Sequence, residues 1–172
     1  VTAPSLTNID KQSEKQYYNN LIKIPQIRGL EIPFWGENIH PFGNDYMLPY
    51  LNPNWENTMT CVPCSTLPSL QNTTIGLASN NEDSRLYSLK LHRNAFETFN
   101  LINQHFSKNI FLAIEIASAP INKENQSSLK SFRKSLEEII SWDWGESKIL
   151  IEHCDTYKKN SNFDKGFLNL ND

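Results

Sequence analysis

Apolar and polar positions alternate along the chain in a way that predicts helices and strands in turn. Apolar side chains recur at helical spacing over residues 11–23, and Asp10 can cap the start of that helix. Residues 109–117 are almost continuously apolar, as in strands buried on both faces of a parallel sheet. Helices are predicted near residues 10–23, 45–51, 80–106 and 125–140, and strands over residues 29–35, 57–62, 109–117 and 148–152.

The order of these elements indicates an α/β fold. Strands that alternate with helices form parallel sheets through right-handed crossovers. Residues 36–56 and 63–80 are predicted to be mainly loops, because Gly and Pro interrupt them. Only four strands are visible, whereas an α/β barrel needs eight. We therefore expect residues 1–172 to form one domain, either a small open sheet or part of a barrel truncated at both ends.

Composition excludes some classes of partner. The chain has 172 residues, with 16 Lys and Arg against 19 Asp and Glu, so it lacks the basic excess of a nucleic-acid-binding protein. No apolar run reaches the length of a membrane span. Three Cys are too few for a disulfide scaffold, and the cytoplasm is the simplest setting. A small molecule is the partner that this composition leaves open.

Three predicted strands carry a Glu near the carboxyl end, namely Glu31, Glu115 and Glu152. Strand parity places each of them opposite the preceding apolar residue. In a barrel that face points inward, so the carboxylates would converge, and they could bind a divalent cation or share a proton. The alternative is that each Glu pairs separately with a basic side chain or the backbone.

The last predicted strand ends abruptly in Glu152-His153-Cys154-Asp155. Enzymes of the α/β class keep their chemistry at the carboxyl ends of strands. Imidazole together with carboxylates suits Zn²⁺, Mn²⁺ or a general base. The alternative is an ordinary polar loop after a core strand.

Aromatic side chains in the loop after the first strand are candidate substrate contacts. Trp35 and His40 would face the mouth of a barrel, although such side chains also serve as packed lids. His92 and His105 fall on the longest predicted helix and are interpreted as ordinary helix residues.

Cys61-Val-Pro-Cys64 offers a different chemistry. The spacing is that of thiol redox proteins, whose mechanism needs a helix that begins directly after the first Cys and lowers its pKa. Pro68 argues against a good helix here, so redox function is not favoured. A structural zinc site is not favoured either, because there is no second Cys pair.

Several short segments together resemble a known superfamily. They are Gly29-Leu-Glu-Ile-Pro-Phe34, Gly76-Leu-Ala-Ser79, Glu115-Ile-Ala-Ser-Ala-Pro120, Trp142-Asp-Trp144, Ile151-Glu-His-Cys-Asp155 and Lys165-Gly-Phe-Leu168. In order and spacing the chain is similar to the xylose-isomerase-like TIM barrels, which include sugar isomerases and epimerases. More narrowly, it resembles an uncharacterised bacterial family of that superfamily, known only as a domain of unknown function.

The resemblance implies a (β/α)8 barrel of which the chain holds the second to fifth strands. In that superfamily a Glu at the end of the fifth strand is typically a metal ligand, and Glu152 matches it. The other usual ligands come from the sixth to eighth strands, which this sequence does not contain. Glu31 matches a common second-strand Glu whose role varies.

These observations favour a sugar isomerase or epimerase that depends on Mn²⁺, Mg²⁺ or Zn²⁺ bound by Glu152. The expected catalytic residues are Glu115, Glu152, His153 and Asp155, and the expected substrate contacts are Glu31, Trp35 and His40. The alternatives are a non-catalytic carbohydrate or metabolite binder on the same barrel and, less favoured, a redox protein that uses the Cys pair. Open sheet edges would also favour pairing with a second copy.

Overall fold

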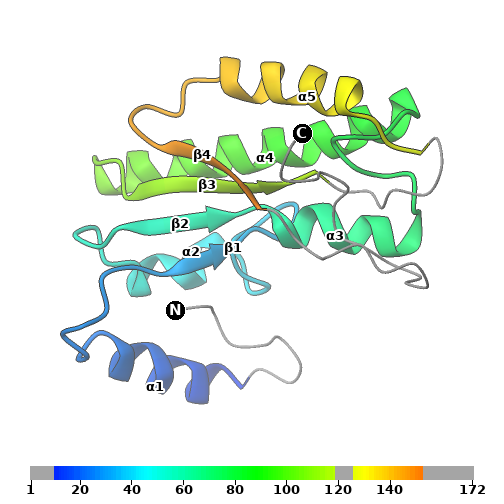
Figure 1. The fold of residues 1–172 in the computed structure, drawn as a ribbon. Helices are drawn as coiled ribbons and strands as arrows, with labels where there is room; N and C mark the ends of the chain where they lie inside the picture. Colours follow the sequence, from blue (N-terminus) through cyan, green and yellow to red (C-terminus); the bar gives the residue numbers. More distant parts are fainter. Residues whose placement is uncertain (1–9, 119–125, 153–172) are drawn as a thin grey trace.

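Four parallel strands form one sheet in the computed structural model, which describes residues 10–118 and 126–152 (Figure 1). The strands lie in the order β1-β2-β3-β4, and helices are interleaved with them along the chain. The strands are β1 (Glu31–Pro33), β2 (Asn57–Thr60), β3 (Phe111–Ala117) and β4 (Lys148–Glu152). The helices are α1 (Lys11–Leu21), α2 (Asn44–Met47), the 3-10 turn η1 (Leu48–Tyr50), α3 (Val62–Gln71), α4 (Glu82–Phe106) and α5 (Leu129–Ser141). This confirms the predicted α/β class with a parallel sheet.

Side-chain caps fix the amino ends of the three longest helices. Asp10 accepts hydrogen bonds from the backbone of Gln12 and Ser13 at the start of α1. Asn81 caps α4, and Ser128, one residue beyond the predicted range of 125–127, caps α5. Each cap satisfies backbone N–H groups that have no partner within the helix.

The core lies between the sheet and the helices packed along it. Ile32, Met59, Ile114 and Ile116 are fully buried, and they share one hydrophobic cluster with the α4 residues Leu89, Ala95, Phe99 and Ile102. In Figure 1, α4 and α5 run along the β3 and β4 side, whereas α1 lies beyond β1. No helix in the described ranges is long and apolar enough to cross a membrane.

One predicted loop is wrong, because residues 62–71 form α3. Pro63 stands in the first turn, where its missing N–H costs nothing. Pro68 lies inside the helix and removes one backbone hydrogen bond. The helix nevertheless continues, and its C-cap Asn72 donates its N–H to the Pro68 carbonyl at 2.9 Å. Packing of α3 against β3 and α4 outweighs the local propensity that favoured a loop.

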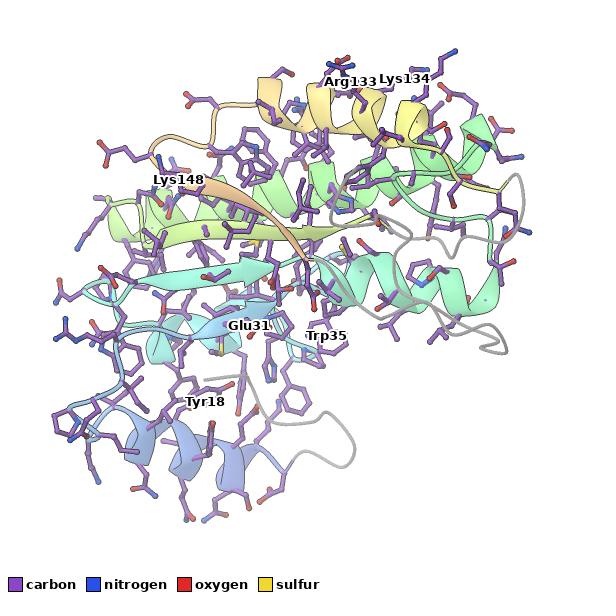
Figure 2. All side chains as sticks on the ribbon, viewed as in Figure 1. Tyr18, Glu31, Trp35, Arg133, Lys134 and Lys148 are labelled. Carbon is purple, nitrogen blue, oxygen red and sulfur yellow. The ribbon has the colours of Figure 1, made fainter. Side chains whose placement is uncertain are left out.

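A buried arginine connects α4 with α5. Arg85 is 2% exposed and donates to both carboxylate oxygens of Glu82, at 2.9 and 2.7 Å. It also donates to the Ser135 hydroxyl at 3.0 Å, and that hydroxyl donates to the Leu77 carbonyl at 2.7 Å. Lys134 on α5 also donates to the Glu82 carboxylate, at 2.5 Å, whereas Arg133 projects away from the sheet (Figure 2).

Candidate functional site

The three strand carboxylates share one face of the sheet. In a parallel sheet, paired residues point their side chains to the same face, and alternate residues along a strand do likewise. The register pairs Glu31 with Thr58, Thr60 with Glu115, and Ala117 with Glu152. Glu31, Glu115 and Glu152 therefore lie on the face opposite the apolar core residues Ile32, Ile114 and Ile116. Glu115 and Glu152 lie toward the carboxyl ends of their strands as predicted, but the prediction is wrong for Glu31, which is the first residue of the short strand β1.

The electrostatics of Glu115 show that these carboxylates lie within range of one another. Burial is the largest cause of the raised pKa of Glu115, and a hydrogen bond from Thr60 partly offsets it. The negative charges of Glu152 and Glu31 raise this pKa further. The carboxylates on this face thus repel one another, and a bound cation or a shared proton would reduce the repulsion.

The carboxylates are not gathered as closely as the ligands of a finished metal site. Among the residues that the structure describes, three ligand atoms lie within 4.8 Å of one another only in a thiol and imidazole cluster described below. A cation at the carboxylates would need additional ligands. His153 and Asp155, predicted beside Glu152, lie outside the described residues.

Trp35 and His40 belong to a different location, a pocket of about 540 Å³. The loop after β1, α3 and α4 enclose it, and Glu31, Glu115 and Glu152 do not line it. Figure 2 shows Glu31 on β1 and Trp35 beyond its end. The indole N–H of Trp35 is buried and has no hydrogen-bond partner.

His40 has both ring nitrogens engaged within the protein. The backbone N–H of Phe42 donates to Nδ1 at 3.0 Å, so Nε2 carries the proton. Nε2 lies 2.9 Å from the Glu14 carboxylate on α1, in a buried pair. His40 therefore joins the loop after β1 to α1, and only its ring surface is available to a ligand in the pocket.

Helix α4 also holds the loop that carries Trp35. The side-chain amide of Asn94 donates to the Gly36 carbonyl at 3.0 Å. Gly36 has φ +103°, a conformation that L side chains rarely adopt. The pocket is consequently defined by a fixed backbone as well as by its side chains.

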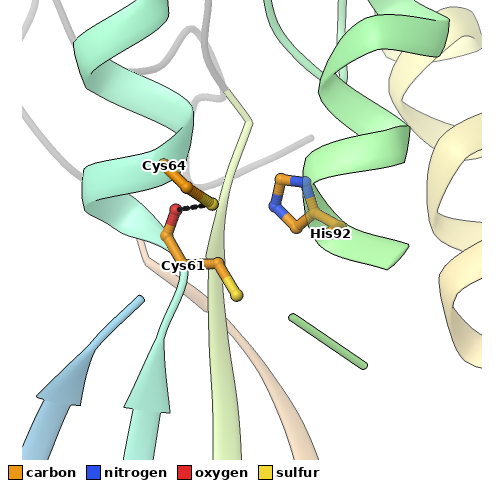
Figure 3. Close-up of side chains that lie close together, drawn as sticks. All are labelled: Cys61, Cys64 and His92. Atoms are coloured by element: carbon orange, nitrogen blue, oxygen red, sulfur yellow. Dashed lines mark hydrogen bonds between the residues drawn. The ribbon is translucent and has the colours of Figure 1, made fainter. Parts of the chain in front are cut away.

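A second cluster, missed by the sequence interpretation, lies between the sheet and α4. Cys61, Cys64 and His92 are all buried, and their ligand atoms lie within 4.8 Å of one another (Figure 3). Cys61 follows β2 and is the N-cap residue of α3, and its backbone N–H donates to the Glu115 carbonyl at 2.7 Å. His92 lies on the buried stripe of α4, at i+3 from Leu89 and i−7 from Phe99. The helical spacing of the apolar positions on α4 could have indicated that His92 is buried. It could not show which other segment of the chain packs against His92.

The Cys pair meets one requirement of a redox motif and fails another. The helix after the first Cys, judged absent from the sequence, is present as α3. The pKa of Cys61 is nevertheless raised, first by its interaction with the Cys64 thiol and then by burial. A reactive thiolate needs the opposite shift and an exposed sulfur. The helix therefore fits a redox motif, whereas the burial of both sulfurs does not.

Comparison with known proteins decides the family. Residues 1–172 match the model of a family described as a domain of unknown function, DUF4862. The chain belongs to the DUF4862 family. This DUF4862 chain is 31% identical over 155 residues to the uncharacterised protein STM3670 of Salmonella typhimurium strain LT2. The match covers 89% of the chain and 49% of the relative, so the chain spans about half of the relative's length. No solved structure matches it.

Proposed function

We propose that this DUF4862 chain is part of an α/β-barrel enzyme that isomerises or epimerises a small hydroxylated, carbohydrate-like substrate with the help of a divalent cation. One observation carries the proposal: Glu31, Glu115 and Glu152 share a face of the parallel sheet and interact electrostatically. In α/β enzymes the substrate lies at the carboxyl ends of the strands. Glu115 and Glu152 stand near those ends in β3 and β4.

Glu115 is the proposed acid–base residue. Its raised pKa brings a carboxyl group closer to the working pH, which improves proton transfer. The hydrogen bond from Thr60 fixes its orientation. In this role Glu115 takes a proton from a carbon next to the substrate carbonyl and returns it to the neighbouring carbon; an epimerisation would need a second acid on the opposite face of the substrate to supply the proton.

Glu152 is the proposed cation ligand, with Glu31 contacting substrate hydroxyl groups. Carboxylate oxygens are ligands that Mg²⁺ and Mn²⁺ prefer, and the mutual repulsion on this face fits a cation. The cation would stabilise negative charge on the substrate oxygen. His153 and Asp155 remain proposed companions in proton transfer.

Activity and binding assays on the complete protein test this proposal. Aldoses and ketoses are screened for turnover with Mn²⁺, Mg²⁺ or Zn²⁺, and cation binding is measured by calorimetry. Glu115→Gln should lower kcat by about 10²- to 10⁴-fold. Glu152→Gln should weaken cation binding, while Glu146→Gln, at an exposed Glu just before β4, should change neither. Absence of cation binding, together with unchanged ligand binding by Glu152→Gln, would overturn the proposal.

The pocket beside Trp35 favours a second candidate, a metabolite binder without catalysis. Its volume of about 540 Å³ suits a small molecule, and aromatic and polar side chains such as Trp35 and Asn94 line it. Trp35→Phe should weaken binding in a ligand screen read by tryptophan fluorescence, whereas Trp55→Phe, outside the pocket, should not. Tight binding without turnover would favour this candidate over the enzyme.

A further inference from the structure

Cys61, Cys64 and His92 bring soft metal ligands together from three places in the fold. Cys61 directly follows β2, Cys64 lies in the first turn of α3, and His92 projects from α4 (Figure 3). We propose that these three residues bind one thiophilic cation, with Zn²⁺ as the reference ion. This site is separate from the carboxylate face, because Cys61 points to the core side of the sheet, where it is fully buried.

The spacing is close to that of a bound ion. The three ligand atoms lie within 4.8 Å of one another. Tetrahedral Zn²⁺ with Zn–S bonds of about 2.3 Å holds two sulfurs about 3.8 Å apart. Side-chain rotations that bring the atoms together by about 1 Å or less therefore complete the geometry without a change in the backbone.

His92 already presents the correct nitrogen. Its Nδ1 lies 2.8 Å from the Ser88 carbonyl, which can only accept, so Nδ1 carries the proton and Nε2 keeps its lone pair. Metal-bound histidines usually donate their second N–H to such an acceptor.

Charge balance favours a divalent cation in this buried place. Without metal, the Cys64 thiol donates to the Cys61 carbonyl at 3.1 Å. Binding converts two thiols and Zn²⁺ into a neutral zinc bis-thiolate and releases two protons to solvent. The neutral product avoids the cost of an unpaired charge in the core.

Cys64 places the proposed site next to the pocket that holds Trp35. The hydroxyl of Ser65 lies 3.4 Å from His92 Nε2. Zinc with three protein ligands keeps an open position for water or another ligand.

Metal titration of the complete protein tests the site. Chelator-treated, reduced protein is titrated with Co²⁺ and Zn²⁺, and thiolate-to-cobalt absorption in the near ultraviolet separates this site from carboxylate ligation. The test variants are Cys61→Ser with Cys64→Ser, and His92→Gln. The matched controls are Cys154→Ser, the third cysteine, and His105→Gln, an exposed histidine of the same helix.

We expect one Co²⁺ per chain with a thiolate band, displaced by one Zn²⁺. The band should be absent from the double Cys variant, and His92→Gln should weaken binding more than about 100-fold, beyond what loss of an outer-shell contact costs. Both controls should bind as the unmodified protein does. Absence of a thiolate band, or its persistence in the double variant, would overturn the proposal.

A measurement without substitutions covers the case in which the variants fail to fold. Iodoacetamide modification of the unmodified protein is followed by mass spectrometry at Cys61 and Cys64, with and without one equivalent of Zn²⁺. Zinc should slow modification of both thiols at least tenfold. Equal rates, or a Cys61–Cys64 disulfide that excludes zinc under reducing conditions, would contradict the proposal.

Discussion

Burial and repulsion by neighbouring carboxylates both raise the pKa of Glu115. Its raised folded pKa means that folding disfavours the ionised form, so the side chain lowers stability once the pH exceeds its ordinary value of 4.5. Glu115→Gln should therefore raise the free energy of unfolding at pH 7. The gain should vanish near pH 4, where the carboxyl is protonated in both states. Urea unfolding at the two pH values measures this, with Glu146→Gln as an exposed control, and a loss of stability at pH 7 would refute the assignment.

Gly29 shows a constraint of a different kind, a close backbone approach before β1. A Cβ at this position would lie 2.0 Å from the Glu56 carbonyl oxygen. Gly29→Ala should destabilise the protein by about 1–3 kcal/mol or more, because β1 and β2 must separate. Gly43→Ala, where nothing lies within 4 Å, should lose about 1–3 kcal/mol through backbone strain alone, because its φ of +92° and ψ of 165° lie in a region essentially restricted to Gly. Thermal unfolding measures both losses, and a loss for Gly29→Ala below about 1 kcal/mol would refute the close approach.

The interactions of some residues could be predicted from the sequence, whereas those of others could not. Asp10 could be identified as a cap because a cap acts within three residues of itself. His92 could not be assigned to the thiols, because the contact depends on how α4 packs over the end of β2, about 30 residues earlier in the chain. The partners of His40 and Arg85 were likewise set by distant elements.

At the scale of elements, Arg85 is the connection to test. Arg85→Ala would leave Glu82 and Ser135 without their shared donor. Glu82 is about half exposed and keeps its ion pair with Lys134, so we expect a loss of about 1–3 kcal/mol, below the range for a charge left buried without a partner. Arg133→Ala is the matched control, because that arginine is 80% exposed and its pair with Glu137 should contribute less than about 1 kcal/mol. Denaturant unfolding separates the two variants, and similar losses would argue against the buried connection.

Helices and strands were predicted correctly where the burial of apolar side chains alone determines the element. Apolar runs defined β3 and β4, and β4 spans the predicted residues 148–152. The prediction failed at α3, where two prolines oppose the helix and contacts with β3 and α4 stabilise it. The stability of such a helix depends on tertiary contacts, and the order of apolar and polar residues along the chain does not reveal those contacts.

At the scale of the whole molecule, β4 is an edge of the described sheet. Leu150 and Ile151 are each 45% exposed on it. Apolar edge strands promote pairing with another chain, so Ile151→Lys should reduce self-association of the 172-residue chain. Light scattering over a concentration series measures this, with Ile140→Lys, at an exposed position on α5, as a control. Unchanged or greater association of Ile151→Lys would exclude a role for the edge.

The α/β class of the architecture could be predicted from the sequence, whereas closure of the sheet into a barrel could not. Alternating elements specify parallel strands in sequential order, and the sheet has that order. The carboxylates followed from parity, since period-two alternation fixes a face once the strand is known. The pocket and the thiol cluster lie between elements, so their shape depends on side chains from three segments at once.

Residues 60 and 61 link the two proposed sites through a single peptide. Thr60 contacts the Glu115 carboxylate on one face, while the next residue supplies a sulfur on the other and its N–H binds the Glu115 carbonyl. Substitutions on opposite faces here should show epistasis, because each alters the strand geometry that the other requires. Selection for a new substrate at the carboxylates would then also change metal affinity in the core, and the two traits would not evolve independently.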